Sequence, residues 1–195
     1  LKMLKNGSYV DAAGRPCILE SVVAFLDLLG FSQASTATAN SQESQQTLDR
    51  IVAAIQDSRE FTRQSIGDDA NVAAWGLKFF SDNLVLALPL EQADHPASVI
   101  RFIIRCVQNY QLRMALNGLF LRGALTMGAI CLTDEIIFGP ALVEGYRLES
   151  KVSIVPRVMV EQPLLDMLKH TQQRTKTEAA EAPEEPTEPE RPDFS

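Results

Sequence analysis

The sequence predicts an α+β fold in which an antiparallel sheet carries helices on one face. Strand-like apolar runs alternate with amphipathic stretches of helical spacing, in the order strand, helix, strand, strand, helix, strand. With 46% hydrophobic residues, a chain of 195 residues can bury one core. This element order is that of the ferredoxin-like βαββαβ arrangement.

The first half of the chain supplies a strand, a helix and a hairpin. Residues 17–26 are apolar and rich in Val, which predicts a central strand that ends at Asp27. The polar stretch 33–46 is expected to be a loop, and apolar residues at helical spacing predict a helix over 45–66. In "LKFFSDNLVLAL", an Asp-Asn turn separates two apolar runs, so we expect a hairpin with Asp82 at its bend.

The second half supplies the remaining elements and a tail. Helical spacing over 99–117 predicts the second helix, and "LFLRGALTMGAICL" predicts a strand with a hairpin partner. A short helix is expected from Gly139 to about Lys151, then a strand at "PRVMVEQ" and a last helix over 163–168. Residues 1–171 are expected to form one domain, and the Pro- and Glu-rich residues 172–195 a flexible tail.

Charge and cysteine content limit the classes of partner. The net charge is −7, and most of it lies between Thr177 and Ser195, where there are seven acidic residues and one basic residue. The nearly neutral body disfavours nucleic acid as a partner. Three widely spaced cysteines in apolar surroundings predict buried thiols in a reducing compartment. Because no segment is long and apolar enough to span a bilayer, we expect a cytoplasmic protein with no membrane contact.

Two aspartates are the candidate metal ligands. Asp27 stands in the apolar run "VAFLDLLGFS", and a buried carboxylate needs a partner, for which a bound cation is the obvious candidate. In the predicted sheet the first strand lies next to the hairpin, so Asp27 and Asp82 can lie side by side and share a divalent cation. Gly30 would let the backbone of "LLGFS" approach phosphate oxygens closely. Taken alone, Asp82 is more simply explained as a turn residue.

Four blocks of the sequence together resemble the class III nucleotidyl cyclases. "FLDLLGFS" is similar to the "FxDIxGFT" motif of that family, and "LKFFSDNLVLAL" to its "KxxGD" hairpin. "LRGALTMG" resembles the "RxGIxxG" strand, and "IFGPALVEGYRLES" the "WGxxVNxAxRM" helix. The blocks occur in the order of the family between about Val22 and Ser150. In size and in the last block, the chain most resembles the pyrimidine cyclases of bacterial Pycsar anti-phage systems.

The resemblance implies a role for each matching residue. Asp27 and Asp82, with the carbonyl of Leu28, would bind two Mg²⁺ or Mn²⁺ ions, and Arg147 would stabilise the transition state. The backbone that would hold the β- and γ-phosphates comprises Leu29, Gly30, Phe31 and Ser32. Class III sites form between two catalytic units, so the resemblance also implies a homodimer with sites at its interface. A separate effector would be activated by the cyclic nucleotide in anti-phage defence.

Departures from the family pattern bear on the base. Val143 replaces the asparagine that orients the ribose, which leaves Glu144 as the nearest polar group, and Ile136 replaces the adenine-reading aspartate. Lys78 matches the base-contacting lysine of adenylate cyclases, and Tyr146 is a candidate for base stacking. Because the purine-reading pair is incomplete, the favoured substrate is UTP, converted to 3',5'-cyclic UMP. CTP and ATP are the alternatives.

Other functions stay open at this stage. Arg147 and Glu144 are three residues apart on a helix and could form only a surface ion pair. A nucleotide-binding module without catalysis would explain the departures at Val143 and Ile136. A palm-type polymerase or dinucleotide cyclase is less well supported, because the hairpin reads "FFSDN" and not "GGDEF".

Overall fold

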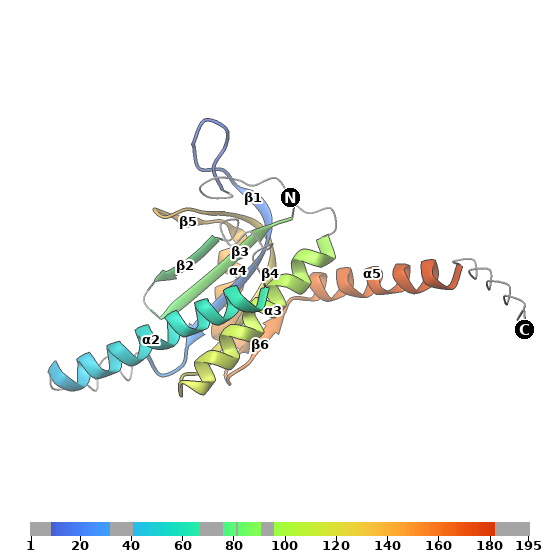
Figure 1. The fold of residues 1–195 in the computed structure, drawn as a ribbon. Helices are drawn as coiled ribbons and strands as arrows, with labels where there is room; N and C mark the ends of the chain where they lie inside the picture. Colours follow the sequence, from blue (N-terminus) through green and yellow to red (C-terminus); the bar gives the residue numbers. More distant parts are fainter. Residues whose placement is uncertain (1–8, 32–40, 67–75, 81, 91–95, 182–195) are drawn as a thin grey trace, which may run out of the picture.

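The computed structural model describes residues 9–31, 41–66, 76–80, 82–90 and 96–181 (Figure 1). The elements in chain order are β1 (Leu19–Leu28), α2 (Ser41–Ile66), β2 (Gly76–Phe80), β3 (Asn83–Pro89), α3 (Pro96–Leu116), β4 (Leu121–Leu132), β5 (Ile137–Phe138), α4 (Pro140–Val152), β6 (Val158–Val160) and α5 (Gln162–Glu181). This order confirms the predicted α+β fold, with β1, α2, β2, β3, α3 and β4 as its βαββαβ unit.

Strand β1 is the centre of the sheet. The hydrogen-bonded order is β2-β3-β1-β4-β5, and β6 adds to β4 in parallel. Residues 21–26 of β1 are all buried, which explains why the strand is apolar on both faces. In the antiparallel registers, Asp27 pairs with Asn83 on one side and with Arg122 on the other. The sheet therefore places residues that are far apart in sequence at the same end of β1.

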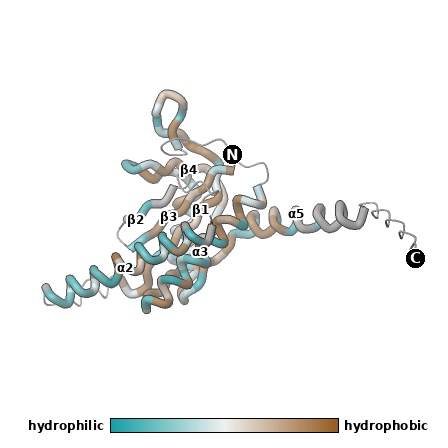
Figure 2. Tube along the Cα trace, in the orientation of Figure 1, coloured by the Kyte–Doolittle hydropathy of each residue, from teal (hydrophilic) through white to brown (hydrophobic). Residues whose placement is uncertain are grey.

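Helices cover both faces of this sheet. Helices α2 and α3, with the start of α5, pack on the face that includes Leu26 and Leu86. Helix α4 and the segment that contains Tyr9 cover the opposite face, where Val23 and Phe25 lie. Figure 2 shows that β1, β3 and β4 are largely hydrophobic, whereas the N-terminal part of α2 is hydrophilic. The first two helices thus share one face, as predicted, and α4 forms a second layer on the other.

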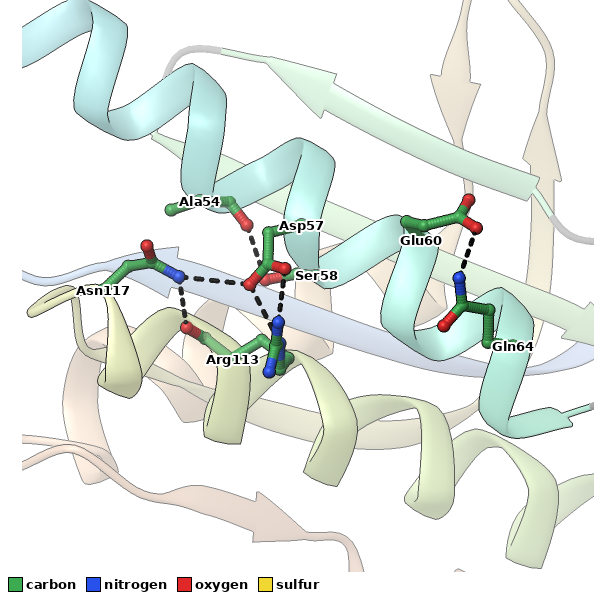
Figure 3. A network of polar contacts seen from close by, with 7 residues as sticks. All are labelled: Ala54, Asp57, Ser58, Glu60, Gln64, Arg113 and Asn117. Carbon is green, nitrogen blue, oxygen red and sulfur yellow. Dashed lines mark hydrogen bonds and ion pairs between the residues drawn. The ribbon is translucent and has the colours of Figure 1, made fainter.

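A polar cluster joins α2 to α3 (Figure 3). Arg113 donates two hydrogen bonds to the carboxylate of Asp57, and Asn117 donates a third, at 3.3 Å. The guanidinium of Arg113 also lies 4.8 Å from the ring centroid of Phe61. Hydrogen bonding from Arg113 lowers the pKa of Asp57 below its usual range. The cluster thus links the two helices through partly buried side chains.

The largest difference from the predicted elements is the last helix. It continues to Glu181, well past the predicted end at Leu168, because residues 169–181 contain good helix formers and no proline. Part of the segment expected to be tail is therefore helical, and residues 182–195 lie outside the described part. Of the loop expected at 33–46, residues 33–40 lie outside the described part. Residues 41–46 are helical, because α2 begins at Ser41. None of the described helices is long and apolar enough to cross a membrane.

Candidate active site

Asp27 lies near the end of β1 with its side chain 14% exposed. The Arg122 guanidinium on β4 donates a hydrogen bond from Nε to Asp27 Oδ2 at 2.9 Å. The partner that the buried carboxylate requires is thus a cation of the protein itself. Sequence reasoning expected a bound cation at this point and gave Arg122 no role. The only signal in the sequence was the arginine in "LRGAL", whose position opposite Asp27 depends on strand register.

Asp82 lies in the turn between β2 and β3, as the hairpin prediction required. The backbone N–H of Leu28 donates to the carbonyl oxygen of Asp82 at 3.0 Å. The side chain of Asn83 donates to Asp82 Oδ1, also at 3.0 Å. The structure therefore brings Asp82 next to Leu28 and Asp27, and these are the three residues named as metal ligands.

A third carboxylate, Glu149 of α4, lies at the same place. Its side chain is 4% exposed, and its Oε1 is 2.7 Å from Nε of Arg122. Burial raises the pKa of Glu149; Arg122 opposes this shift, and the charges of Asp27 and Asp82 add to it. Sequence reasoning missed Glu149, although it follows the buried Gly145 by four residues and so shares the inner face of the helix.

The oxygen donors at this end of β1 suit a hard divalent cation. Asp27 and Leu28 are consecutive in β1, and Asp82 is joined to Leu28 through a backbone hydrogen bond, so two carboxylate side chains and a backbone carbonyl come from adjoining residues. Mg²⁺ binds to one or two carboxylates and keeps its other positions for water and substrate phosphates. In the parts of the chain that the structure describes, no group of three or more His, Cys, Asp or Glu side chains forms a complete metal cage. The residues fit Mg²⁺ or Mn²⁺ that is bound together with a phosphate ligand.

The backbone after β1 is partly available for phosphates. The N–H of Leu29 already donates to the carbonyl of Phe120 at 2.9 Å, which argues against Leu29 as an N–H donor to a ligand. Gly30 has φ of 80°, a conformation that favours glycine, and Phe31 packs its ring against the core. The N–H groups of Gly30 and Phe31 are therefore the remaining candidates. Ser32 lies outside the described residues.

Lys78 is tied to the turn between β4 and β5. Its Nζ donates to the carbonyl oxygens of Thr133, at 3.1 Å, and Asp134, at 2.5 Å. Ile136 belongs to the same turn: its N–H donates to Thr133 Oγ1 at 3.3 Å. The side chain of Lys78 is thus fixed by hydrogen bonds to the turn that contains Ile136.

Arg147 lies on the outer face of α4, bound to Glu144. Arg147 Nε donates to Glu144 Oε2 at 2.7 Å, and Nη2 donates to Oε1 at 2.5 Å. This hydrogen bonding lowers the pKa of Glu144 and raises that of Arg147. Val143 is 67% exposed, and Tyr146 is 59% exposed with its ring edge-on to Phe25 at 6.0 Å between centroids. Within the chain, the bidentate ion pair keeps the guanidinium of Arg147 on its own helix.

Known structures share this fold. No protein-family profile matches the sequence, and no curated protein matches it either. The adenylyl cyclase CyaB from P. aeruginosa has a TM-score of 0.60 and 12% identity, covering 78% of this chain and 82% of that one. A class III adenylyl cyclase-like ATP-binding protein from Pseudomonas aeruginosa has a TM-score of 0.54 and 14% identity, covering 82% of this chain and 38% of that one. The chain therefore has the fold of the class III adenylyl cyclase domain.

Proposed function

We propose that the protein is a nucleotidyl cyclase that converts a nucleoside triphosphate into its 3',5'-cyclic monophosphate and pyrophosphate. The observation that carries this proposal is the position of Asp27 and Asp82 at the same end of the central strand, in a fold shared with class III adenylyl cyclases. The guanidinium of Arg122 beside them adds positive charge where phosphates would lie.

Each part of the site has a task in this reaction. The ribose 3'-oxygen loses its proton and bonds to the α-phosphorus, while the bond from that phosphorus to the pyrophosphate oxygen breaks. Asp27, Asp82 and the Leu28 carbonyl would hold two Mg²⁺ or Mn²⁺ ions. When bound, these ions lower the pKa of the 3'-hydroxyl and neutralise phosphate charge. The backbone N–H groups at Gly30 and Phe31, together with Ser32, would hold the β- and γ-phosphates.

Arg147 fits a site that is completed by a second copy of the chain. A guanidinium over the α-phosphate stabilises the charge that develops during phosphoryl transfer. Arg147 is exposed on α4, and large apolar side chains of this helix and of the β4–β5 segment before it are exposed too. These exposed side chains are Ile136, Phe138, Val143 and Tyr146. A homodimer would cover this surface and place Arg147 of one copy over the aspartates of the other.

The substrate that we favour is UTP, for cyclic UMP synthesis in anti-phage signalling to a separate effector. Two of the three donors on the Lys78 ammonium are used by the turn carbonyls, which leaves one for a base. A pyrimidine carbonyl oxygen could accept it, and the exposed Ile136 offers no polar group to read an adenine amine. Val143, Glu144 and Tyr146 would border the ribose and base. CTP is the first alternative and ATP the second.

The test is direct. The purified protein is incubated separately with ATP, GTP, CTP and UTP in Mn²⁺, and the products are resolved by mass, with Asp27→Asn and Asp82→Asn as controls. Conversion of one nucleotide to its cyclic monophosphate, lost in both variants, would support the proposal. Mixed with Arg147→Ala protomers, Asp27→Asn protomers should recover activity. If the protomers exchange and none is recovered, Arg147 does not act across an interface.

A second candidate is a nucleotide-binding module without catalysis. It is favoured by the ion pair that holds Arg147 on Glu144, and by Val143 at the position of the ribose-orienting asparagine. One of the similar structures is itself named as an ATP-binding protein. Binding of one triphosphate with Mn²⁺, without release of pyrophosphate, would select this function over cyclisation.

A further inference from the structure

The guanidinium of Arg122 lies between two carboxylates. Its Nε is 2.9 Å from Asp27 Oδ2 and 2.7 Å from Glu149 Oε1. Nε carries only one hydrogen, and the hydrogen bond of good geometry goes to Asp27. Glu149 therefore forms an ion pair with Arg122 at 2.7 Å but does not accept a hydrogen bond from Nε.

This leaves a buried carboxylate oxygen without a donor. Among the described residues, Oε1 of Glu149 has no hydrogen-bond partner, although the side chain is only 4% exposed. A buried charged oxygen without a hydrogen bond is costly, and such groups are rare in native proteins. The cost is explained if the oxygen gains its hydrogen bond in another state of the site.

Metal binding would create that state. A divalent cation held by Asp27 would draw on the carboxylate that now accepts from Arg122, and its charge would repel the guanidinium. Glu149 is the acceptor already in contact with Nε, on a helix that packs against β1 and β4. We propose that Glu149 is a positioning residue that takes over Arg122 when Asp27 binds a divalent cation, so that Arg122 stays beside the metal without competing for Asp27.

This inference rests on the proposed function, because it requires a metal at Asp27, and the test separates the two. Binding of Mn²⁺ alone is titrated by the electron paramagnetic resonance signal of the free ion. Wild type is compared with Asp27→Asn, Glu149→Gln and Asp166→Asn. Asp166→Asn removes the same charge from α5, where the carboxylate is half-exposed. Thermal melting of each variant checks that it is folded.

The expected result is a specific loss of metal affinity. Without the charge of Glu149, Arg122 stays on Asp27, so Glu149→Gln should weaken Mn²⁺ binding about tenfold, as removal of residues that orient metal ligands commonly does. Asp166→Asn should bind like wild type. Glu149→Asp keeps the charge at shorter reach, so it should lose less affinity; it also serves as the second variant if Glu149→Gln does not fold.

A double-mutant comparison shows whether Glu149 acts through Arg122. With Arg122→Gln no guanidinium competes for Asp27, so adding Glu149→Gln should cost clearly less affinity than in wild type. An equal cost in both backgrounds would overturn the inference, as would unchanged binding by both Glu149 variants. If Asp27→Asn binds Mn²⁺ as wild type does, the metal site of the proposed function fails, and this inference fails with it.

Discussion

Gly145 sets how closely α4 approaches the central strand, and a methyl group at this position tests that contact. A Cβ on Gly145 would lie 2.9 Å from Cβ of Phe25, 3.6 Å from its Cγ and 3.8 Å from Oγ1 of Thr126. The nearest of these atoms is one bond from the β1 backbone, so no rotamer change can move it. Gly145→Ala therefore requires a small shift of α4 away from the sheet.

Two opposing energies decide the outcome. Replacement of glycine by alanine inside a helix stabilises it by about 1 kcal/mol. Overpacking of a well-packed contact costs about 1–3 kcal/mol. Because the contact is with a backbone-anchored atom, we expect the second effect to prevail and Gly145→Ala to lower the free energy of unfolding by about 1 kcal/mol. Gly145→Val should cost about 3 kcal/mol or more, since it adds further methyl groups at the same point.

Urea unfolding monitored by circular dichroism measures this change, with Lys151→Ala, an exposed position on the same helix, as the control. The control should stay within about 0.5 kcal/mol of wild type. Because Glu149 shares the inner face with Gly145, the shift should also weaken Mn²⁺ binding. If Gly145→Ala instead gains the full helix-propensity energy, α4 is not limited by its contact with Phe25, and the reasoning is refuted.

Three other predictions concern single contacts. The pKa of Asp57 is lowered from 3.8, so its pairing with Arg113 stabilises the fold above that pH and is lost in more acidic solution; melting temperatures from pH 6 to 3 should fall more for wild type than for Asp57→Asn. Tyr9→Phe removes the buried hydrogen bond of 2.9 Å to Ser21, which should cost about 1 kcal/mol in urea unfolding; no change would show that the bond contributes nothing. Lys78→Met should raise KM for the accepted nucleotide more than it lowers kcat; the opposite split would remove Lys78 from base binding.

The fold and the positions of Asp27 and Asp82 could be predicted because their signals are local. Apolar periodicity marks the strands and helices, and the Asp-Asn turn places Asp82 at the end of a hairpin. Asp27 then lies near Asp82 because β3 pairs with β1, so the hairpin turn is next to the end of β1. The sequence predicts a shorter α5 than the structure has. The acidic residues and prolines that follow it favour a flexible tail, although residues 169–181 themselves are good helix formers.

The partners of the charged residues could not be predicted in this way. Arg122 is separated from Asp27 by 95 residues, and Lys78 from the carbonyl of Asp134 by 56. The first contact depends on the register of β1 and β4, and a shift of one residue would turn Arg122 to the other face. The second joins β2 to a turn that follows a strand it does not pair with, so it depends on the folded sheet as a whole. For the same reason the sequence predicts a bound cation at Asp27 but not the guanidinium of Arg122 that lies beside it.

Helix α4 links the two halves of the proposed site. Arg147 and Glu149 are two residues apart, so they lie on different faces of the helix: Arg147 outward with Glu144, Glu149 inward with Arg122. Over two residues a helix is stiff, so any displacement of α4 that accompanies a change at Glu149 also moves Arg147 on the exposed surface. We therefore expect metal binding at Asp27 to be coupled to the position of Arg147 through α4. In the proposed homodimer, the ion pair with Glu144 would hold Arg147 in place until the guanidinium binds a phosphate of the nucleotide in the site of the second copy.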